Sequence, residues 1–499
     1  MKLKTMLLSV AAMALAFAGN AQTHQLERTS PEAEGVSSKA VMAMMDSLTS
    51  LPGVDIHSIV VARNGKVIGE AYPAPFSDEY KHTLYSCSKT FVSTAIGIAI
   101  GENRLRLTDR VAPLFAGELP DTISENLAGI TVRDLLTMTA GIVPDWEMRN
   151  HRKDWIHGYL SKPVSEPGKQ FQYDSLCTYM LSAIVEKVTG MNTLDYLKLH
   201  VFTPMGITDV EWEESPEGYN TGGWGLHIQP ESMTAFGQLI LNKGNWHGKQ
   251  LIPSDWVEAM TSRQQEAGKE DYCYQMWQCD YPGAVRADGA YGQYIIMIPD
   301  RNMVVTITQC SSMDGLKERG IIWRTLMPGV GSEPLAAGKD YKKLLEKQKS
   351  YSLALPQGKA SSKQAAAVDG KTIELAENEL GWKSLTLHFS KGAVVASVEC
   401  ADGDRCSMEL GYKKWKISEI EAYPPYSIMA QERFKGLEKR FHTGGAYAWA
   451  SSSKLVMDLQ YVDWISSLLI TVDFGSENPV FKVVRNYAGG ELEIKGTLK

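Results

Sequence analysis

The chain has 499 residues, a formal net charge of −7 and 44% apolar residues. This length predicts two or three domains, and the apolar fraction is typical of a globular protein with a substantial core. The acidic balance, without a cluster of basic residues, argues against nucleic-acid binding. A small molecule is therefore the expected partner.

The N-terminus has the composition of a secretory signal. Two lysines precede an apolar run at residues 6–18, and the small residues Gly19 and Ala21 occupy the −3 and −1 positions of a cut before Gln22. The run is too short for a stable transmembrane anchor; an uncleaved anchor or a buried helix is the alternative. The sequence predicts a signal peptide at residues 1–21, no membrane anchor after its cleavage, and a secreted or periplasmic protein.

The next 300 residues or so combine strand and helix patterns. The expected elements are a helix at 38–51, a hairpin with strands 56–62 and 66–72 around an Asn-Gly turn, helices at 175–189 and 231–241, and strands at 293–298 and 303–308. Early strands, a helical middle and late strands predict an α/β domain at 22–328. Its expected fold is a mixed, mainly antiparallel sheet, flanked by helices and carrying a helical lobe.

The C-terminal third has a different pattern. Residues 329–366 are rich in Gly, Lys, Ser and Ala, which predicts a linker. From 367 to 499 short alternating strands recur at roughly the 8–12-residue spacing of a small sandwich or barrel. We expect an all-β domain that packs on the first domain or shapes its substrate site, because no catalytic cluster is recognisable in it.

Seven cysteines in an exported chain leave at least one unpaired. Cys400 and Cys406 flank a turn-like segment between two expected strands, and they are the first candidates for a disulfide. Cys273 and Cys279 are the second candidates.

The first candidate for chemistry is residues 85–91, Tyr-Ser-Cys-Ser-Lys-Thr-Phe, directly before an apolar run of helix length. Residues three apart on a helix share a face, so the Ser86 hydroxyl and the Lys89 amine are expected side by side. An amine whose pKa is lowered by burial can take the proton of a serine. For the pair alone, the alternative is a helix N-cap followed by a surface lysine.

Two further segments supply candidate partners. Tyr173 lies just before an expected helix, where its hydroxyl could reach a cleft; a structural tyrosine is the alternative. Residues 288–291, Asp-Gly-Ala-Tyr, lead into an expected strand. Small residues there allow a ligand to approach the backbone closely, and a bulged edge strand is the alternative.

These segments together resemble the serine β-lactamase and penicillin-binding protein superfamily. The nucleophile motif at 85–91 is closest to the class C-like branch, which holds DD-peptidases, esterases and 6-aminohexanoate-dimer hydrolases. Five more segments resemble that branch in the same order: 130–141, 171–175, 222–226, 272–277 and 288–293.

The resemblance implies a role for each matching residue. Ser86 would be the acylated nucleophile, Lys89 its general base, and Tyr173 the group that shares the proton and delivers it to the leaving group. The backbone N–H groups of Ser86 and Tyr291 would form the oxyanion hole. Substrate-binding positions would be Ser175, Asp288, Gly289 and Ala290. No metal or organic cofactor is expected, because serine, lysine and tyrosine complete the proton path.

The chain departs from the family pattern at two of these positions. Ser175 replaces an asparagine, and Asp288 replaces the lysine or histidine that would attract a carboxylate. Unless Asp288 points to solvent, it should repel carboxylate substrates and favour a neutral or cationic ester or amide. The predicted function is an exported serine hydrolase acting on an ester or amide. The alternatives are a penicillin-binding or β-lactamase-like protein, and a non-catalytic binding or sensor protein that keeps the fold.

Overall fold

The computed structural model describes residues 25–426, 428, 430 and 432–499. The predicted signal peptide, residues 1–21, lies outside the described residues. Among the described helices, none combines the length and the apolar character needed to cross a membrane.

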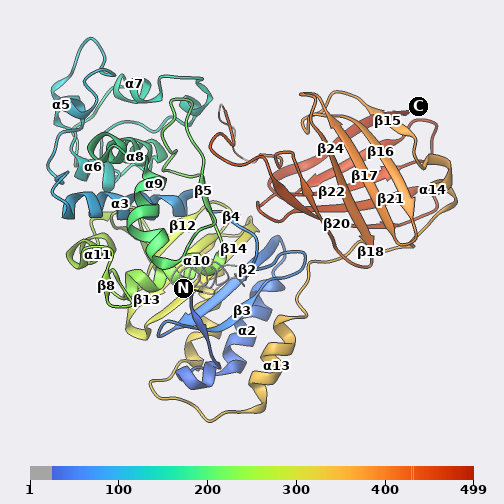
Figure 1. The fold of residues 1–499 in the computed structure, drawn as a ribbon, viewed down its shortest axis with the longest axis horizontal. Coiled ribbons are helices and arrows are strands. Elements are labelled where there is room, and N and C mark those ends of the chain that lie inside the picture. The colour runs from blue at the N-terminus through green and yellow to red at the C-terminus, as the bar shows by residue number, and fades with distance from the viewer. Residues whose placement is uncertain (1–24, 427, 429, 431) are drawn as a thin grey trace, which may run out of the picture.

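A nine-stranded sheet forms the centre of the first domain (Figure 1), in the order β1-β3-β2-β14-β13-β12-β11-β10-β9. Only the β1–β3 pair is parallel. Strands from the two ends of the domain pair at β2–β14, which confirms the predicted mixed, mainly antiparallel sheet. The strands are β1 (Glu27–Arg28), β2 (Val54–Arg63), β3 (Lys66–Ala71), β9 (Gln265–Glu266), β10 (Asp271–Tyr272), β11 (Trp277–Gln278), β12 (Val285–Gly289), β13 (Gln293–Ile298) and β14 (Met303–Ser311).

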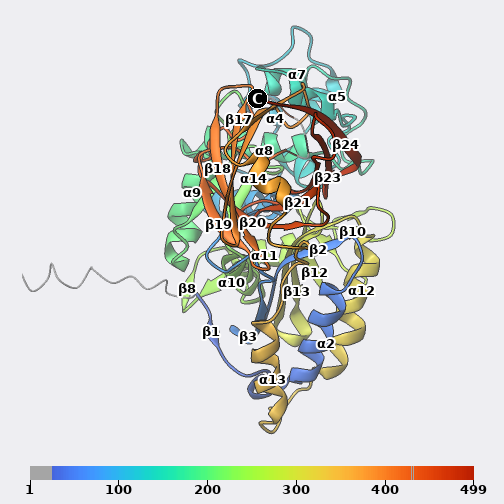
Figure 2. The same cartoon turned by 90° about the vertical axis from the view of Figure 1, so that its right-hand side faces the viewer.

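Helices cover both faces of this sheet. Alternate residues of β2 enter different cores, with Ile59 and Val61 on one face and Val60 and Ala62 on the other. The first face is covered by α2 (Ser38–Thr49), α12 (Gly315–Thr325) and α13 (Lys339–Gln348), which pack together (Figure 2). The opposite face is covered by α10 (Pro230–Leu241) and by α3 (Ser88–Gly101), which contacts β12.

The helical lobe fills the middle of the chain. Its longest helix is α8, which begins and ends where predicted because Asp174 caps its first turn and Gly190, with a φ of 76°, ends it. Besides α3 and α10, the α-helices and strands between β3 and β9 are β4 (His82–Thr83), α4 (Val111–Leu114), α5 (Glu125–Gly129), α6 (Val132–Leu136), α7 (Trp155–Leu160), α8 (Ser175–Thr189), α9 (Thr193–Leu197), β5 (Val210–Trp212), β6 (Leu226–Ile228), β7 (Asn245–Trp246), β8 (Lys249–Gln250) and α11 (Ser254–Thr261).

The segment predicted as a linker, residues 329–366, contains α13 and the beginning of α14 (Lys363–Val368). Leu344 of α13 is fully buried where the helix packs on α2. Four of the ten residues of α13 are lysines, and the rest of the segment is rich in Gly, Ser and Ala, so the buried stripe of the helix is easily missed in the sequence.

The C-terminal domain is one ten-stranded sheet whose sequential pairs are antiparallel, and it closes on itself through a parallel pairing of β18 with β20. It is all-β as predicted, and closure of one sheet distinguishes it from a two-sheet sandwich. Alternate side chains of β21, Leu455, Met457 and Leu459, fill its interior. The strands are β15 (Thr372–Leu375), β16 (Trp382–Ser390), β17 (Ala393–Cys400), β18 (Arg405–Tyr412), β19 (Lys416–Ile420), β20 (Phe441–Trp449), β21 (Lys454–Tyr461), β22 (Ser467–Asp473), β23 (Val480–Arg485) and β24 (Ala488–Leu498).

All seven cysteines are free thiols, so both disulfide predictions, Cys400–Cys406 and Cys273–Cys279, are wrong. Cys406 pairs directly with Val398 across β17 and β18, which places Cys400 on the diagonal. Diagonal neighbours are about 7–8 Å apart, beyond the usual Cα separation of a disulfide, about 4.4–6.8 Å.

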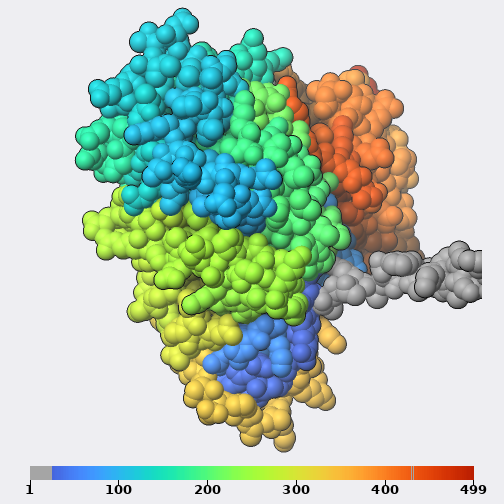
Figure 3. Space-filling view, turned by 60° about the vertical axis from the view of Figure 1, so that its left-hand side comes forward, coloured from blue at the N-terminus to red at the C-terminus, as the bar shows by residue number. Residues whose placement is uncertain are grey.

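The C-terminal domain lies directly against the helical lobe (Figure 3). The Tyr426 hydroxyl donates to Glu213 Oε1 at 2.7 Å, and the Trp464 ring stacks on His227 with ring centroids 5.0 Å apart. This contact brings residues of the closed sheet domain to the site described next.

Candidate functional site

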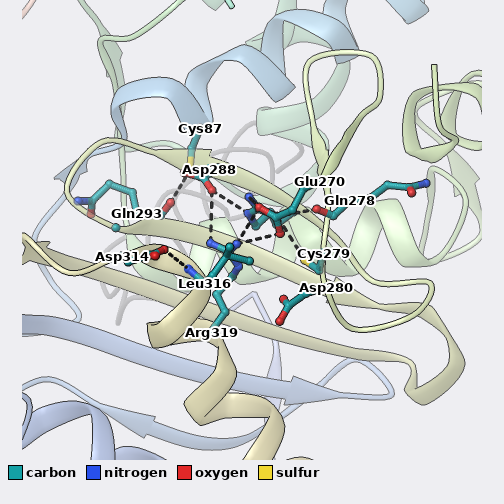
Figure 4. Close-up of polar contacts among 12 residues, drawn as sticks. Cys87, Glu270, Gln278, Cys279, Asp280, Asp288, Gln293, Asp314, Leu316 and Arg319 are labelled. Atoms are coloured by element: carbon teal, nitrogen blue, oxygen red, sulfur yellow. Dashed lines mark hydrogen bonds and ion pairs between the residues drawn. The ribbon is translucent and has the colours of Figure 1, made fainter. Parts of the chain in front are cut away.

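Ser86 lies in a tight turn between β4 and α3. The 3₁₀ turn Tyr85–Cys87 precedes the helix, and Tyr85 has a φ of 46°, which non-glycine residues rarely adopt. The late strands hold this turn in place. The Cys87 thiol donates to the Gln293 carbonyl at 3.1 Å (Figure 4), and a Cβ at Gly289 would lie only 2.3 Å from the Leu84 carbonyl oxygen. The nucleophile candidate is therefore fixed against β12 and β13.

Lys89 is buried, with 1% of its surface exposed. Its Nζ lies 2.8 Å from Ser86 Oγ, 2.9 Å from Ser175 Oγ and 2.6 Å from the Gly223 carbonyl oxygen. Burial lowers the pKa of the amine to about 7, although Asp174 acts in the opposite direction. A neutral amine can donate to Gly223 and Ser175 and still accept the Ser86 proton, so this geometry suits a general base.

Tyr173 lies on the other side of Ser86. Its side chain is hydrogen-bonded to Ser86, and Lys89 Nζ lies 4.9 Å from the centre of its ring. Burial raises the pKa of the phenol well above its ordinary value, and the hydrogen bond to Ser86 opposes this shift only in part. At neutral pH the phenol therefore keeps its proton and can donate it.

The N-terminus of α8 and a glycine loop complete the surroundings of Lys89. Asp174 Oδ1 accepts the Leu176 N–H at 2.9 Å, which orients the first helical turn and with it Ser175. A Cβ at Gly223 would lie 2.5 Å from the Ser175 carbonyl oxygen, so only glycine allows this loop to approach α8 so closely.

A cavity of about 450 Å³ lies beside these groups. Five predicted site residues line it: Ser86, Tyr173, Ser175, Asp288 and Ala290. Lys89 lies just behind Ser86 and Ser175. Gly289 and Tyr291 are outside the lining, and the Tyr291 ring packs on Tyr85 with centroids 5.5 Å apart. An oxyanion role for the Tyr291 backbone N–H stays a prediction.

Asp288 belongs to an ion-pair network on the cavity wall (Figure 4). Its Oδ2 accepts from Arg286 Nε at 2.7 Å and lies 3.8 Å from Arg319 Nη1, while Glu270 bridges the same two arginines. Two carboxylates and two guanidiniums balance in charge. The prediction that Asp288 repels carboxylate substrates assumed an uncompensated charge, and the structure contradicts that assumption.

The sequence interpretation missed part of the cavity wall. The helical lobe, the glycine loop and β11 supply three tryptophans, and two arginines come from separate domains; these residues are Trp146, Trp224, Trp277, Arg149 and Arg433. Trp224 and Trp277 fall within the matched segments 222–226 and 272–277, so both could have been found from the sequence. Arg433 lies in the C-terminal domain, outside every matched segment, and has no signal in the sequence.

Comparison with known proteins identifies the family. Residues 44–320, more than half of the chain, match the family model described as Beta-lactamase. A 6-aminohexanoate-dimer hydrolase of Paenarthrobacter ureafaciens is 24% identical over 286 residues, which span 50% of this chain and 71% of that protein. Penicillin-binding protein 4* of Bacillus subtilis (strain 168) is 30% identical over 144 residues, 25% of this chain and 29% of that protein.

A solved structure shows the same fold. A Bacillus anthracis protein assigned as a 6-aminohexanoate-dimer hydrolase superposes with a TM-score of 0.50 at 20% identity, covering 61% of this chain and 86% of that one. Because the family model matches more than half of the sequence, the chain belongs to the beta-lactamase family, within the superfamily of serine β-lactamases and penicillin-binding proteins.

Proposed function

We propose that this protein is a serine hydrolase that cleaves an ester or amide through an acyl-enzyme on Ser86. One observation carries the proposal: a buried amine with a pKa of about 7 lies 2.8 Å from the serine hydroxyl. At neutral pH a large fraction of Lys89 is uncharged, so it can accept the serine proton without a metal or a histidine.

The proposed reaction follows the positions of the protons. As Ser86 Oγ bonds to the substrate carbonyl carbon, its proton moves to Lys89, and the carbonyl oxygen becomes an oxyanion. Backbone N–H groups at Ser86 and at the turn after β12 would stabilise that oxyanion. The leaving group departs with a proton from Tyr173, and Tyr173 regains one from Lys89. Water then attacks the acyl-enzyme in the same way, with Lys89 again as the base.

The test uses three kinds of substrate. Purified protein is incubated with p-nitrophenyl hexanoate, with the linear dimer of 6-aminohexanoate, and with a chromogenic cephalosporin, each in parallel with Ser86→Ala. Turnover of the ester or of the dimer that is lost in the variant supports the hydrolase. Stable labelling by a fluorescent penicillin, without turnover of any substrate, would instead support a penicillin-binding role. Turnover that persists in Ser86→Ala would refute the proposal.

We further propose that the chain is exported, on the basis of residues 1–21 alone. Expression of the full chain in a Gram-negative host should yield a periplasmic protein whose N-terminal residue is Gln22. Recovery from the cytoplasm with an intact N-terminus would contradict this.

A further inference from the structure

Two arginines from different domains line the cavity that contains Ser86. Arg149 lies in a short 3₁₀ helix of the helical lobe, Trp146–Asn150. Arg433 lies between β19 and β20 of the C-terminal domain. Neither arginine belongs to the balanced network around Asp288, and the proposed acylation steps do not use them.

Arg433 is the more informative of the two. Only 10% of its side chain is exposed, and its guanidinium lies over the Tyr426 ring, 3.0 Å from the ring centre. Within the described part of the chain, its Nε and Nη1 are buried without a hydrogen-bond partner. The carboxylate of Glu213 lies 3.8 Å from Nε, which is too far for a hydrogen bond. Buried guanidinium donors without acceptors are costly, which indicates that a ligand supplies them.

Arg149 adds a second positive charge to the same region. Its Nε donates to the Trp146 carbonyl at 2.9 Å, which leaves the end of the guanidinium available to the cavity. Burial lowers its pKa, and the positive charge of Arg433 lowers it further, so the two guanidiniums are close enough to repel each other. Glu147 also acts on Arg149 but is exposed to solvent.

The charges at this end of the cavity do not balance. Among the described residues, the buried carboxylate beside Arg433 is Glu213, and it already accepts from the Tyr426 hydroxyl. The Asp288 network, which lines the same cavity, is neutral by itself. One negative charge supplied by a ligand would therefore neutralise this end and satisfy the free guanidinium donors.

We propose that Arg149 and Arg433 bind a carboxylate of the substrate, so that the enzyme prefers esters or amides that carry one carboxylate away from the bond being cleaved. A planar carboxylate can accept two parallel hydrogen bonds from a guanidinium. The tryptophans that line the same cavity suit an apolar chain joining the carboxylate to the reacting carbonyl. This inference rests on the proposed function, and it replaces the expected preference for neutral or cationic substrates.

The test compares three p-nitrophenyl esters with acyl chains of equal length: the hexanoate, the mono-adipate and the 6-aminohexanoate. The wild-type kcat/KM should be about tenfold or more higher for the adipate than for the hexanoate, and lowest for the 6-aminohexanoate. Arg433→Gln and Arg149→Gln should each reduce the adipate-to-hexanoate ratio about tenfold, and Arg433→Lys should reduce it less. Arg405→Gln is the matched control, because Arg405 is 78% exposed in the same domain and pairs with Glu399.

The outcomes separate this inference from the proposed function. If turnover depends on Ser86 but the adipate-to-hexanoate ratio of kcat/KM is one or below, the inference is wrong and the hydrolase stands. The same conclusion follows if the ratio is unchanged in both Arg433→Gln and Arg149→Gln. Absence of Ser86-dependent turnover for every ester would refute the hydrolase. In that case calorimetric titration of Ser86→Ala with monomethyl adipate decides the inference: binding that Arg149→Gln weakens supports it, and no binding overturns it. Arg149 is partly exposed, so its variant keeps the test valid if Arg433→Gln does not fold.

Discussion

The pH dependence of acylation tests the role of Lys89 directly. A base with a pKa of about 7 is roughly nine-tenths protonated at pH 6 and roughly nine-tenths neutral at pH 8. Because only the neutral amine can take the Ser86 proton, kcat/KM should rise about tenfold between these two pH values. The neutral phenol of Tyr173 gives no decrease in this interval, since its pKa is raised above the ordinary tyrosine value.

A substitution of Asp174 tests the same pH dependence of kcat/KM. Its negative charge raises the pKa of Lys89, and its own carboxyl, buried, has a pKa raised to about 6. Asp174→Asn removes the charge but keeps a side-chain oxygen that can cap α8. The pKa of Lys89 should then decrease, so the rising limb of kcat/KM should move to lower pH and the activity at pH 6 should increase relative to that at pH 8.

The assay is kcat/KM for p-nitrophenyl hexanoate from pH 5 to 9, corrected for spontaneous hydrolysis. A flat profile between pH 6 and 8, or a rise that continues to pH 9 without a plateau, as expected for a lysine with the ordinary pKa of 10.5, would refute the assignment of Lys89 as the base. A rising limb that moves to higher pH in Asp174→Asn would refute the electrostatic reasoning, even if the wild-type profile agreed with it.

Three further predictions concern the surroundings of the nucleophile. Tyr173→Phe should reduce kcat about 10²–10⁴-fold for ethyl hexanoate and less for p-nitrophenyl hexanoate, because nitrophenolate leaves without a proton; equal losses would exclude proton delivery. Gly223→Ala should cost about 1–3 kcal/mol in denaturant unfolding, because its Cβ would overlap the Ser175 carbonyl; unchanged stability would contradict the close packing. Trp464→Ala and Trp449→Ala each remove a fully buried ring of the C-terminal domain, at about 3–5 kcal/mol. Of these two tryptophans, only Trp464 packs on Tyr85, the residue before the nucleophile. At a temperature where both variants are folded, kcat should therefore fall in Trp464→Ala and stay unchanged in Trp449→Ala.

The parts of the fold that the sequence predicts well are those set by local patterns. The bounds of α8 follow from its cap and its terminal glycine, and those of β13 from an uninterrupted apolar run ended by Pro299. The helix α13 was missed because the overall composition of residues 329–366 indicated a linker, although the helix itself is amphipathic. The closure of the C-terminal sheet depends on the pairing of β18 with β20, which no local pattern specifies.

The site shows the same division between local and long-range information. The approach of Lys89 to Ser86 follows from their spacing of three residues, and the structure brings Tyr173 and Ser175 to the same point. Half of the compensation of Asp288 could have been foreseen, because Arg286 lies two residues earlier on the same face of β12. The other half could not, because Arg319 lies on α12 and approaches Asp288 only in the folded chain. Charge arguments from sequence fail where the partner is distant in the chain.

The C-terminal domain contributes to the site in two separable ways. Trp464 packs on Tyr85, whose left-handed backbone conformation sets the turn that presents Ser86, so this contact acts on the nucleophile itself. Arg433 instead lines the cavity, and within the described residues no hydrogen bond or ion pair joins it to Lys89 or Tyr173. Substitutions around Arg433 can therefore change which substrate enters while the proton path stays intact. The two contributions are distinguished by different measurements, the substrate preference and kcat. They are coupled through a shared neighbour, because Trp464 and Arg433 both pack on the Tyr426 ring. A variant altered at both positions should therefore show losses that are not additive.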